Sequence, residues 1–220
     1  MSAPASPEVR PLRIAVFASG RGSNLQALHR AITHDALPAQ LVGVFSDKAG
    51  SGAIAYAEAQ HIAHSHLDPK SFATREDFDA ALMQKAAAVT PDLIVCAGFM
   101  RIISEAGIRA AACPMINIHP SLLPKYPGLH THARALAAGD AEHGASVHRV
   151  EAVLDGGRIL SQAKIAVMPD DTPERLAQRV LAIEHPLLIA TVRAIAEGRI
   201  TLSEGADTRV SWLNHRLELE

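Results

Sequence analysis

The feature that constrains the fold most is a continuous apolar run from Pro91 to Phe99, bounded by turn-forming residues. A strand whose side chains are apolar on both faces must be covered on both, as in a parallel sheet between layers of helices. Four other short apolar runs alternate with segments of helical spacing, and they span residues 12–18, 40–46, 62–67 and 115–118. The alternation predicts a single α/β domain with a doubly wound, Rossmann-like, mostly parallel sheet.

Two further strands are predicted near the end of the domain. Residues 145–150 alternate as a strand, residues 159–167 form another, and Asp155-Gly156-Gly157 between them is typical of a hairpin. We therefore expect an antiparallel edge on the sheet. The Pro-rich residues 1–11 lack the apolar centre of a signal peptide, so we expect a flexible N-terminal extension there and a C-terminal tail over residues 201–220.

The composition argues against several classes of protein. With 48% hydrophobic and 20% charged residues, the chain has enough apolar content for a large core, and a net charge of −2 is unlike that of a nucleic-acid binder. No apolar run approaches the ~20 residues of a membrane span. Cys96 and Cys113 lie in or beside apolar runs, as reduced thiols of a cytoplasmic protein do. The 12 histidines come without a metal-binding motif, so we expect no metal.

The first candidate site follows the strand at 115–118. Pro120, Pro124 and Pro127 stiffen the loop after it, because each proline fixes φ and removes a backbone donor. Ligands bind at this carboxyl end of a strand in an open α/β sheet. Asn117 and His119 are two residues apart, so they share a face and form a donor pair suited to a developing oxyanion. From the residues alone, an ordinary Pro-rich connector remains the alternative.

The second candidate site is the loop Gly20-Arg21-Gly22-Ser23-Asn24, which joins a predicted strand to a predicted helix. Free N–H groups and the helix dipole make such a junction an anion site. The alternative is a tight turn in which Ser23 or Asn24 caps the helix. A dinucleotide fingerprint requires glycine where this chain has Leu25, which weighs against an NAD-dependent enzyme.

Residues 117–132 carry the pattern Asn-Ile-His-Pro-Ser-Leu-Leu-Pro-Lys-Tyr-Pro-Gly-Leu-His-Thr-His, whose first half resembles the folate-dependent formyltransferase family. The second half is similar to the glycinamide ribonucleotide transformylases within that family. Gly-x-Gly-Ser-Asn at 20–24, Gly-Phe-Met-Arg-Ile at 98–102, Leu-Asp-Gly-Gly at 154–157 and Glu-His-Pro at 184–186 also match the pattern of these transformylases.

The resemblance implies an enzyme that transfers a formyl group from 10-formyltetrahydrofolate to the primary amine of glycinamide ribonucleotide in purine biosynthesis. Asn117 and a protonated His119 are implied to stabilise the oxyanion of the tetrahedral intermediate. Asp155 is implied to face His119 and to raise its pKa. The partners are then small molecules alone, bound by a monomer or a homodimer.

The resemblance also assigns binding residues. The nucleotide-binding half, about 12–112, and the catalytic and folate half, about 113–200, together form the domain of residues 12–200. The implied nucleotide contacts are Gly22, Ser23, Asn24 and Glu184. The implied folate contacts are Arg75, Met100, Arg101, Ile102, Ile103, Asn117, Glu151 and Asp155. The segment Glu151-Ala152-Val153 is less polar than in the family, so we expect backbone groups to hold the pterin there.

Other functions remain open at this point. Within the family, the rivals are formyltetrahydrofolate deformylase, which carries an N-terminal regulatory domain, and methionyl-tRNA formyltransferase, which carries a tRNA-binding domain. Only about a dozen residues precede the first predicted strand, and the chain has no basic stretch for tRNA. From another class, a nucleotide-binding module without turnover is the alternative, and the complete set of Asn117, His119 and Asp155 argues against it.

Overall fold

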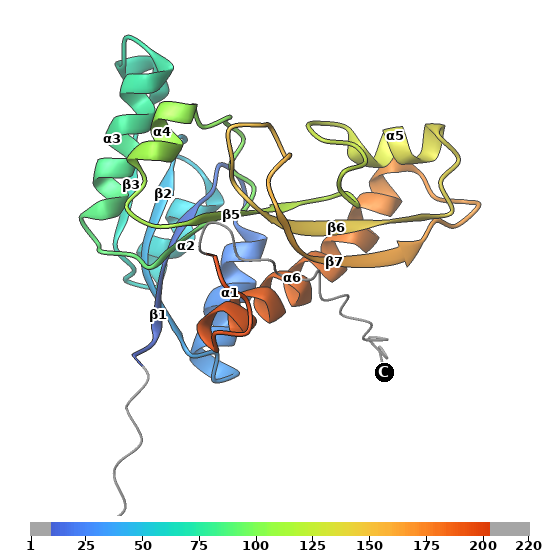
Figure 1. The fold of residues 1–220 in the computed structure, drawn as a ribbon, viewed down its shortest axis with the longest axis horizontal. Helices are drawn as coiled ribbons and strands as arrows, with labels where there is room; N and C mark the ends of the chain where they lie inside the picture. The colour runs from blue at the N-terminus through green and yellow to red at the C-terminus, as the bar shows by residue number, and fades with distance from the viewer. Residues whose placement is uncertain (1–9, 203–220) are drawn as a thin grey trace, which may run out of the picture.

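A seven-stranded sheet forms the centre of the computed structural model, which describes residues 10–202 (Figure 1). The expectations for residues 1–9 and 203–220 lie outside the described residues. The strand order is β3-β2-β1-β4-β5-β6-β7. The strands are β1 (Leu12–Phe17), β2 (Ala39–Ser46), β3 (His64–His66), β4 (Leu93–Cys96), β5 (Met115–His119), β6 (Glu142–Arg149) and β7 (Ile159–Ala166).

The pairing of the strands confirms the predicted fold class. Strands β1 to β5 run parallel to one another, whereas β6 is antiparallel to both β5 and β7. The helices are α1 (Ser23–His34), α2 (Gly52–Ala59), α3 (Arg75–Ala87), α4 (Glu105–Ala110), α5 (Thr131–Ala137) and α6 (Pro173–Ala196), with a 3₁₀ turn at Pro69–Ser71.

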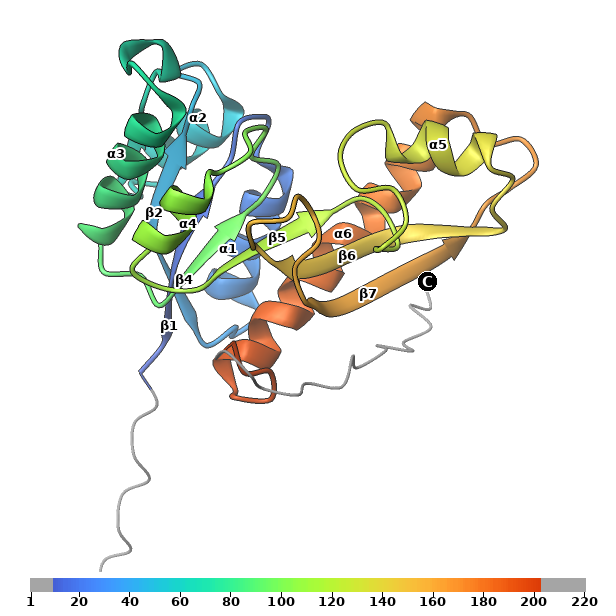
Figure 2. The same cartoon turned by 45° about the horizontal axis from the view of Figure 1, so that its top comes forward.

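Each face of the sheet has its own apolar core, because successive side chains of a strand point to opposite faces. In β1, Ile14 and Val16 join the core under α1, α2 and α6. Ala15 and Phe17 join the second core, which α3 and α4 cover. Figure 1 and Figure 2 show these helices on opposite sides of the parallel strands. The predicted double layer of helices is therefore present.

Two predicted helix boundaries were wrong. The apolar spacing of the sequence predicts a helix over residues 71–89, but α3 begins at Arg75, because Thr74 and Asp77 form a capping box at that point. The sequence also predicts a last helix that begins at Thr172-Pro173 and breaks at Pro186, yet α6 continues through Pro186. Leu176 before the proline and Leu188 after it are buried in the same core, and this shared burial offsets the loss of a helical hydrogen bond of Pro186.

The segment between β6 and β7 is a hairpin loop, longer than a tight turn. It spans residues 150–158, and the backbone N–H of Gly156 donates to the carbonyl of Val153 near its tip. Asp155 has a φ of 49°, which lies in the left-handed region that asparagine and aspartate tolerate better than most residues. The loop thus presents Asp155 at its tip.

The two edges of the sheet differ in length. Strand β3 is short, whereas β7 has eight residues and pairs only with β6 among the described strands. Lys164 of β7 forms an ion pair with Glu142 of β6, and Arg179 donates to the carbonyl of Ala166 at the end of the edge. Within residues 10–202, no helix has the length and apolar character needed to cross a membrane.

We expect Leu28→Ala to lower the free energy of unfolding by about 2–5 kcal/mol, because the side chain is fully buried between α1 and the sheet. Arg30→Ala on the exposed side of the same helix is the control, with an expected change within about 0.5 kcal/mol. Urea denaturation measures both. Equal losses in the two variants would contradict the assigned packing of α1.

Candidate active site

The carboxyl ends of β1 and β4 meet where the strand order reverses, which is where open α/β sheets bind ligands. The loops that follow these strands are joined by two hydrogen bonds. The backbone N–H of Ser19 donates to the carbonyl of Gly98 at 3.0 Å, and the N–H of Met100 donates to Oγ of Ser19 at 2.8 Å. The Gly-x-Gly-Ser-Asn loop and the segment Met100–Ile103 are therefore neighbours.

The N-terminus of α1 is open. Gly22 occupies the capping position with a φ of 76°, and in the described part of the chain no side chain caps the first N–H groups of the helix. The alternative reading, in which Ser23 or Asn24 caps the helix, is wrong, because both residues lie inside the helix. The uncapped N–H groups and the helix dipole make this end attractive to an anion.

Glu184 of α6 lies beside this helix end. Nδ2 of Asn24 donates to Oε2 of Glu184 at 2.9 Å, which brings together two residues that are far apart in the sequence. Burial raises the pKa of Glu184, and the Asn24 hydrogen bond opposes that rise. Oδ1 of Asn24 and Nε2 of His185 are buried and have no hydrogen-bond partner within the described part of the chain. These two buried atoms are therefore available to hydrogen-bond a polar group of a ligand.

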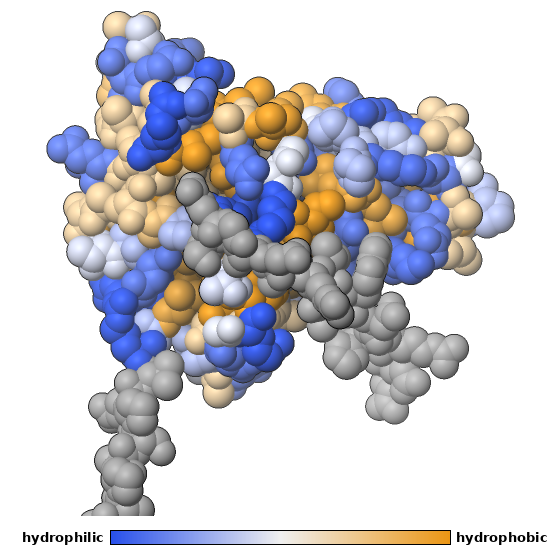
Figure 3. Space-filling view, in the orientation of Figure 1, coloured by the Kyte–Doolittle hydropathy of each residue, from blue (hydrophilic) through white to orange (hydrophobic). Residues whose placement is uncertain are grey.

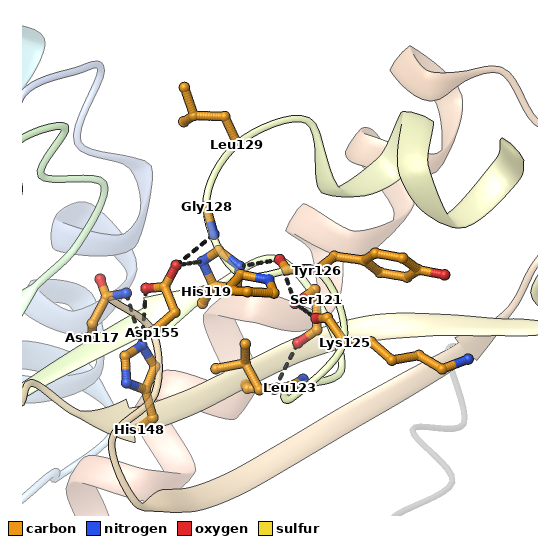
Figure 4. A network of polar contacts seen from close by, with 12 residues as sticks. Asn117, His119, Ser121, Leu123, Lys125, Tyr126, Gly128, Leu129, His148 and Asp155 are labelled. Atoms are coloured by element: carbon orange, nitrogen blue, oxygen red, sulfur yellow. Dashed lines mark hydrogen bonds and ion pairs between the residues drawn. The ribbon is translucent and has the colours of Figure 1, made fainter. Parts of the chain in front are cut away.

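Asn117 and His119 extend from the same face of β5, as their spacing predicts. Ile116 and Ile118 point to the core under α1 and α6, so Asn117 and His119 point to the opposite face. Over this part of the sheet, the loop 150–158 folds back toward the end of β5 and places Asp155 beside His119 (Figure 4). The three residues assigned to catalysis are therefore gathered in one group.

His119 has an acceptor near each ring nitrogen. Nε2 donates to the carbonyl of Tyr126 at 2.9 Å, and Nδ1 lies 3.4 Å from Oδ2 of Asp155 (Figure 4). The same carboxylate oxygen accepts from the backbone N–H of Gly128 at 2.8 Å. Because the carbonyl of Tyr126 can only accept, Nε2 carries the proton of the neutral ring, and a second proton on Nδ1 would face the carboxylate of Asp155.

Burial and neighbouring charges pull the pKa of His119 in opposite directions. Burial lowers this pKa and outweighs the Tyr126 carbonyl and the Asp155 charge, both of which raise it. Asp155 thus acts in the expected direction, but the net pKa of His119 lies below its ordinary value. Burial raises the pKa of Asp155, while contacts with His148 and Gly128 and the charge of His119 lower it and prevail. At rest, the pair therefore favours a carboxylate beside a neutral imidazole.

His148 orients the amide of Asn117. Nδ1 of His148 donates to the carbonyl of Arg149 at 2.8 Å, so its Nε2 is an acceptor in the neutral ring. Asn117 Nδ2 lies 3.1 Å from this Nε2 and donates to it. The second N–H of the Asn117 amide remains for another acceptor. Nε2 of His148 also lies 3.5 Å from Oδ1 of Asp155, to which it can donate only when the ring carries a second proton.

Ser146 holds the Pro-rich loop on the sheet. Its Oγ donates to the carbonyl of Ser121 at 2.6 Å and accepts from the N–H of Leu123 at 3.0 Å. Oγ of Ser121 in turn donates to the carbonyl of Lys125 at 2.7 Å. These bonds fix the loop whose Tyr126 carbonyl accepts from His119, so the orientation of the imidazole depends on them.

Residues 12–192 match the sequence model of the formyl transferase family. The chain belongs to the formyl transferase family. It is 41% identical over 203 residues to the phosphoribosylglycinamide formyltransferase of Escherichia coli K12, a match that covers 92% of this chain and 94% of that protein.

Solved structures of similar proteins have the same fold. Glycinamide ribonucleotide transformylase 1 from Symbiobacterium toebii matches with a TM-score of 0.84 and 37% identity over 89% of this chain and 92% of its own. Phosphoribosylglycinamide formyltransferase from Coxiella burnetii matches with a TM-score of 0.81 and 44% identity, over 86% of this chain and 89% of its own.

Large apolar side chains are exposed in the segment Met100–Ile103 and in the loops that follow β5 and β6. Met100 is 65% exposed and Ile102 is 52% exposed, whereas Ile103 is buried. On the other side of Asp155, the exposed large apolar residues are Leu129, Val153 and Leu154. Figure 3 shows apolar surface gathered in the upper middle of the molecule, between the part with α3 and α4 and the part with α5. Such a surface suits a flat heterocycle.

The remaining expected folate contacts lie in different surroundings. The guanidinium of Arg101 packs over the ring of Phe78, 4.9 Å from its centre. Arg75 is half exposed at the start of α3 and pairs with its neighbour Glu76 at 3.6 Å. Glu151 is exposed and accepts from the N–H of Arg158 at 3.4 Å. The structure places Arg75 and Glu151 outside the hydrogen-bonded group around His119.

Two residues of this group, His148 and Ser146, were not predicted. Both lie in the strand expected at 145–150, and β6 pairs His148 directly with Asn117 and Ser146 with His119. The alternation of that strand was visible in the sequence, but the register that sets these partners was not. The role of His148 can therefore be inferred only when the pairing of β6 with β5 is known.

We expect Asp155→Asn to lower the pKa of His119 further, because the variant removes a negative charge that raises this pKa. Asparagine tolerates the left-handed φ of this position, so the fold is expected to persist. NMR titration of the His119 ring measures the pKa in both proteins. An unchanged or higher pKa in the folded variant would contradict the coupling.

Glu184→Gln tests the burial of a carboxylate beside α1. The pKa of Glu184 is raised above 4.5 in the folded protein, so the folded state releases this proton at a higher pH than the unfolded chain does. The contribution of Glu184 to stability therefore falls as the pH rises. Relative to wild type, the variant is therefore expected to gain stability as the pH rises above about 4.5, as urea denaturation at each pH can measure.

The control for this variant is Glu174→Gln on the same helix. The pKa of Glu174 is lowered, chiefly by backbone and Thr172 hydrogen bonds, so its carboxylate stabilises the folded state as the pH rises. We expect the opposite trend for this control. Identical pH trends in the two variants would contradict the sign assigned to Glu184.

Proposed function

We propose that this formyl transferase moves the formyl group of 10-formyltetrahydrofolate to the primary amine of glycinamide ribonucleotide. The observation that carries the proposal is the group formed by Asn117, His119 and Asp155, with His148 orienting the amide. The similarity to the E. coli phosphoribosylglycinamide formyltransferase along 94% of that protein supports the choice of reaction.

The chemistry follows from the two donors. Attack of the amine on the formyl carbon creates a tetrahedral intermediate with an oxyanion and a positive amine. The second N–H of Asn117 donates to that oxyanion, and the positive charge of protonated His119 stabilises it. The Asp155 carboxylate stabilises the imidazolium once it forms and helps to move the proton from the amine. Transfer of this proton to N10 of the folate, followed by collapse of the oxyanion and cleavage of the bond between the formyl carbon and N10, releases tetrahydrofolate without an acyl-enzyme.

The nucleotide fits the open end of α1. Its phosphate is placed at the uncapped N–H groups of the Gly22-Ser23-Asn24 junction, where an anion meets the helix dipole. Its ribose hydroxyls are placed at Asn24, whose buried Oδ1 has no hydrogen-bond partner among residues 10–202, and at the carboxylate of Glu184. The folate is placed against Met100–Ile103 and the loop 150–158, on the other side of the catalytic group.

The direct test is release of tetrahydrofolate from 10-formyltetrahydrofolate, measured with and without glycinamide ribonucleotide. We expect release only when the amine substrate is present. Release without the amine would favour the deformylase reaction, and binding of the nucleotide without any turnover would favour a nucleotide-binding module. Recovery of formylglycinamide ribonucleotide, measured by mass spectrometry, identifies the product.

Asp155→Asn and Glu184→Gln are expected to change different kinetic constants. Asp155→Asn lowers kcat by about a hundredfold or more, because it removes a charge that acts on the intermediate. Glu184→Gln weakens nucleotide binding by roughly 1.5–3 kcal/mol, because it removes a charge-assisted acceptor, and leaves the KM for the folate unchanged. Glu184 is a cleaner target than Gly22, where an added Cβ would lie 3.0 Å from the Cα of Ala53.

Steady-state kinetics with each substrate varied in turn measures both variants. Thermal melts establish that each is folded. A folded Asp155→Asn enzyme with wild-type kcat would remove Asp155 from the mechanism, and equal changes in both KM values for Glu184→Gln would remove Glu184 from the nucleotide site.

A further inference from the structure

The segment Met100–Ile103 is irregular backbone that is attached to its neighbours at both ends. At its start, the N–H of Met100 donates to Oγ of Ser19. At its end, the N–H of Ser104 donates to Oδ2 of Asp79 at 2.7 Å. Between these points Met100 and Ile102 are exposed, so the attachments at the ends determine where the exposed side chains stand.

Asp79 is an unusual residue for the interior of a helix layer. It lies in α3 among Phe78, Leu82 and Met83, and its relative exposure is 0%. Its Oδ2 accepts the Ser104 bond, while its Oδ1 is buried and has no hydrogen-bond partner among the described residues. A buried carboxylate that is only partly satisfied is costly, and an apolar side chain would join α3 to α4 at lower cost.

The hydrogen bond that Asp79 accepts from Ser104 is also not needed to cap α4. Ser104 already caps this helix, because its own Oγ accepts from the N–H of Gly107 at 3.1 Å. The Asp79 carboxylate instead takes the backbone N–H of the capping residue itself, which is the last point of the preceding segment. The carboxylate therefore fixes the segment rather than the helix.

Gly107 makes room for this arrangement. An added Cβ on Gly107 would lie 2.7 Å from Cβ of Asp79 and 2.9 Å from Cγ2 of Ile103. The close approach of α4 to α3 thus depends on the missing side chain. The adjacent Phe78 supports the same segment, since the Arg101 guanidinium lies over its ring.

We propose that Asp79 is a positioning residue for the folate, which holds the Met100–Ile103 wall in place through the N–H of Ser104. The inference rests on the proposed function, because it takes the Met100–Ile103 segment as the surface that receives the formyl donor. Asp79 touches neither substrate and acts only through this backbone bond. Gly107 permits the bond by leaving space for the carboxylate.

The test compares Asp79→Ala, Asp79→Asn and Gly107→Ala with wild type. Asp79→Ala is expected to raise the KM for 10-formyltetrahydrofolate about tenfold, since it removes one hydrogen bond to a charged acceptor, while the KM for the nucleotide stays unchanged. Asp79→Asn keeps an oxygen that accepts from Ser104 and is expected to stay within about twofold of wild type. Gly107→Ala is expected to raise the folate KM as Asp79→Ala does.

Direct binding of tetrahydrofolate, measured by calorimetry, separates the wall from the chemistry. The matched control is Gln84→Ala on the exposed side of α3, which is expected to change neither KM nor binding. If Asp79→Ala does not fold, Gly107→Ala decides the question, because alanine favours a helix and its Cβ would displace Asp79 and Ile103 from their present contact.

Three results would overturn the inference. The first is a folded Asp79→Ala or Gly107→Ala enzyme with wild-type folate KM, and the second is a parallel rise in both KM values. The third is an Asp79→Asn variant as impaired as Asp79→Ala. Failure of wild type to bind tetrahydrofolate or to transfer formyl would instead refute the proposed function, so the two failures are distinguishable.

Discussion

Burial of β1 and β4 on both faces is the constraint on which the rest of the structure depends. Ile14 and Val16 require cover from α1 and α6, while Ala15 and Phe17 require cover from α3. Helices on both faces leave the carboxyl ends of the strands as the place where loops can emerge side by side. The loop before α1 and the segment after β4 are adjacent for this reason, although more than seventy residues separate them in the sequence.

In the group proposed to be catalytic, the burial of His119 opposes the charges around it. His119 is almost fully buried, which favours the neutral ring, yet each of its nitrogens faces an oxygen that favours a proton. A ring held in this way is poised to gain a proton when new negative charge appears beside it. The hydrogen bonds of Ser146 and His148 fix the geometry in advance, so little reorganisation is needed when the charge develops.

The sequence was informative where one local pattern determined the structure. Both faces of β4 are apolar, and Thr172-Pro173 begins α6 as its capping chemistry predicts. The sequence was uninformative where packing between distant segments determines the structure. Helix α6 continues through Pro186 because residues on both sides of the proline are buried in one core. The group around His119 was predicted from motifs, but the contribution of His148 depends on a strand register that no local pattern encodes.

The edges of the sheet have a consequence for behaviour at high concentration. A sheet edge offers unpaired backbone groups that can recruit a strand from another molecule. Here β3 is too short to support extended pairing. Strand β7 carries the charged Lys164, and Arg179 donates a hydrogen bond to the carbonyl of Ala166 at its end. Charge and a side chain already bonded to the edge oppose the docking of a foreign strand, so the seven-stranded sheet resists edge-to-edge aggregation without being closed into a barrel.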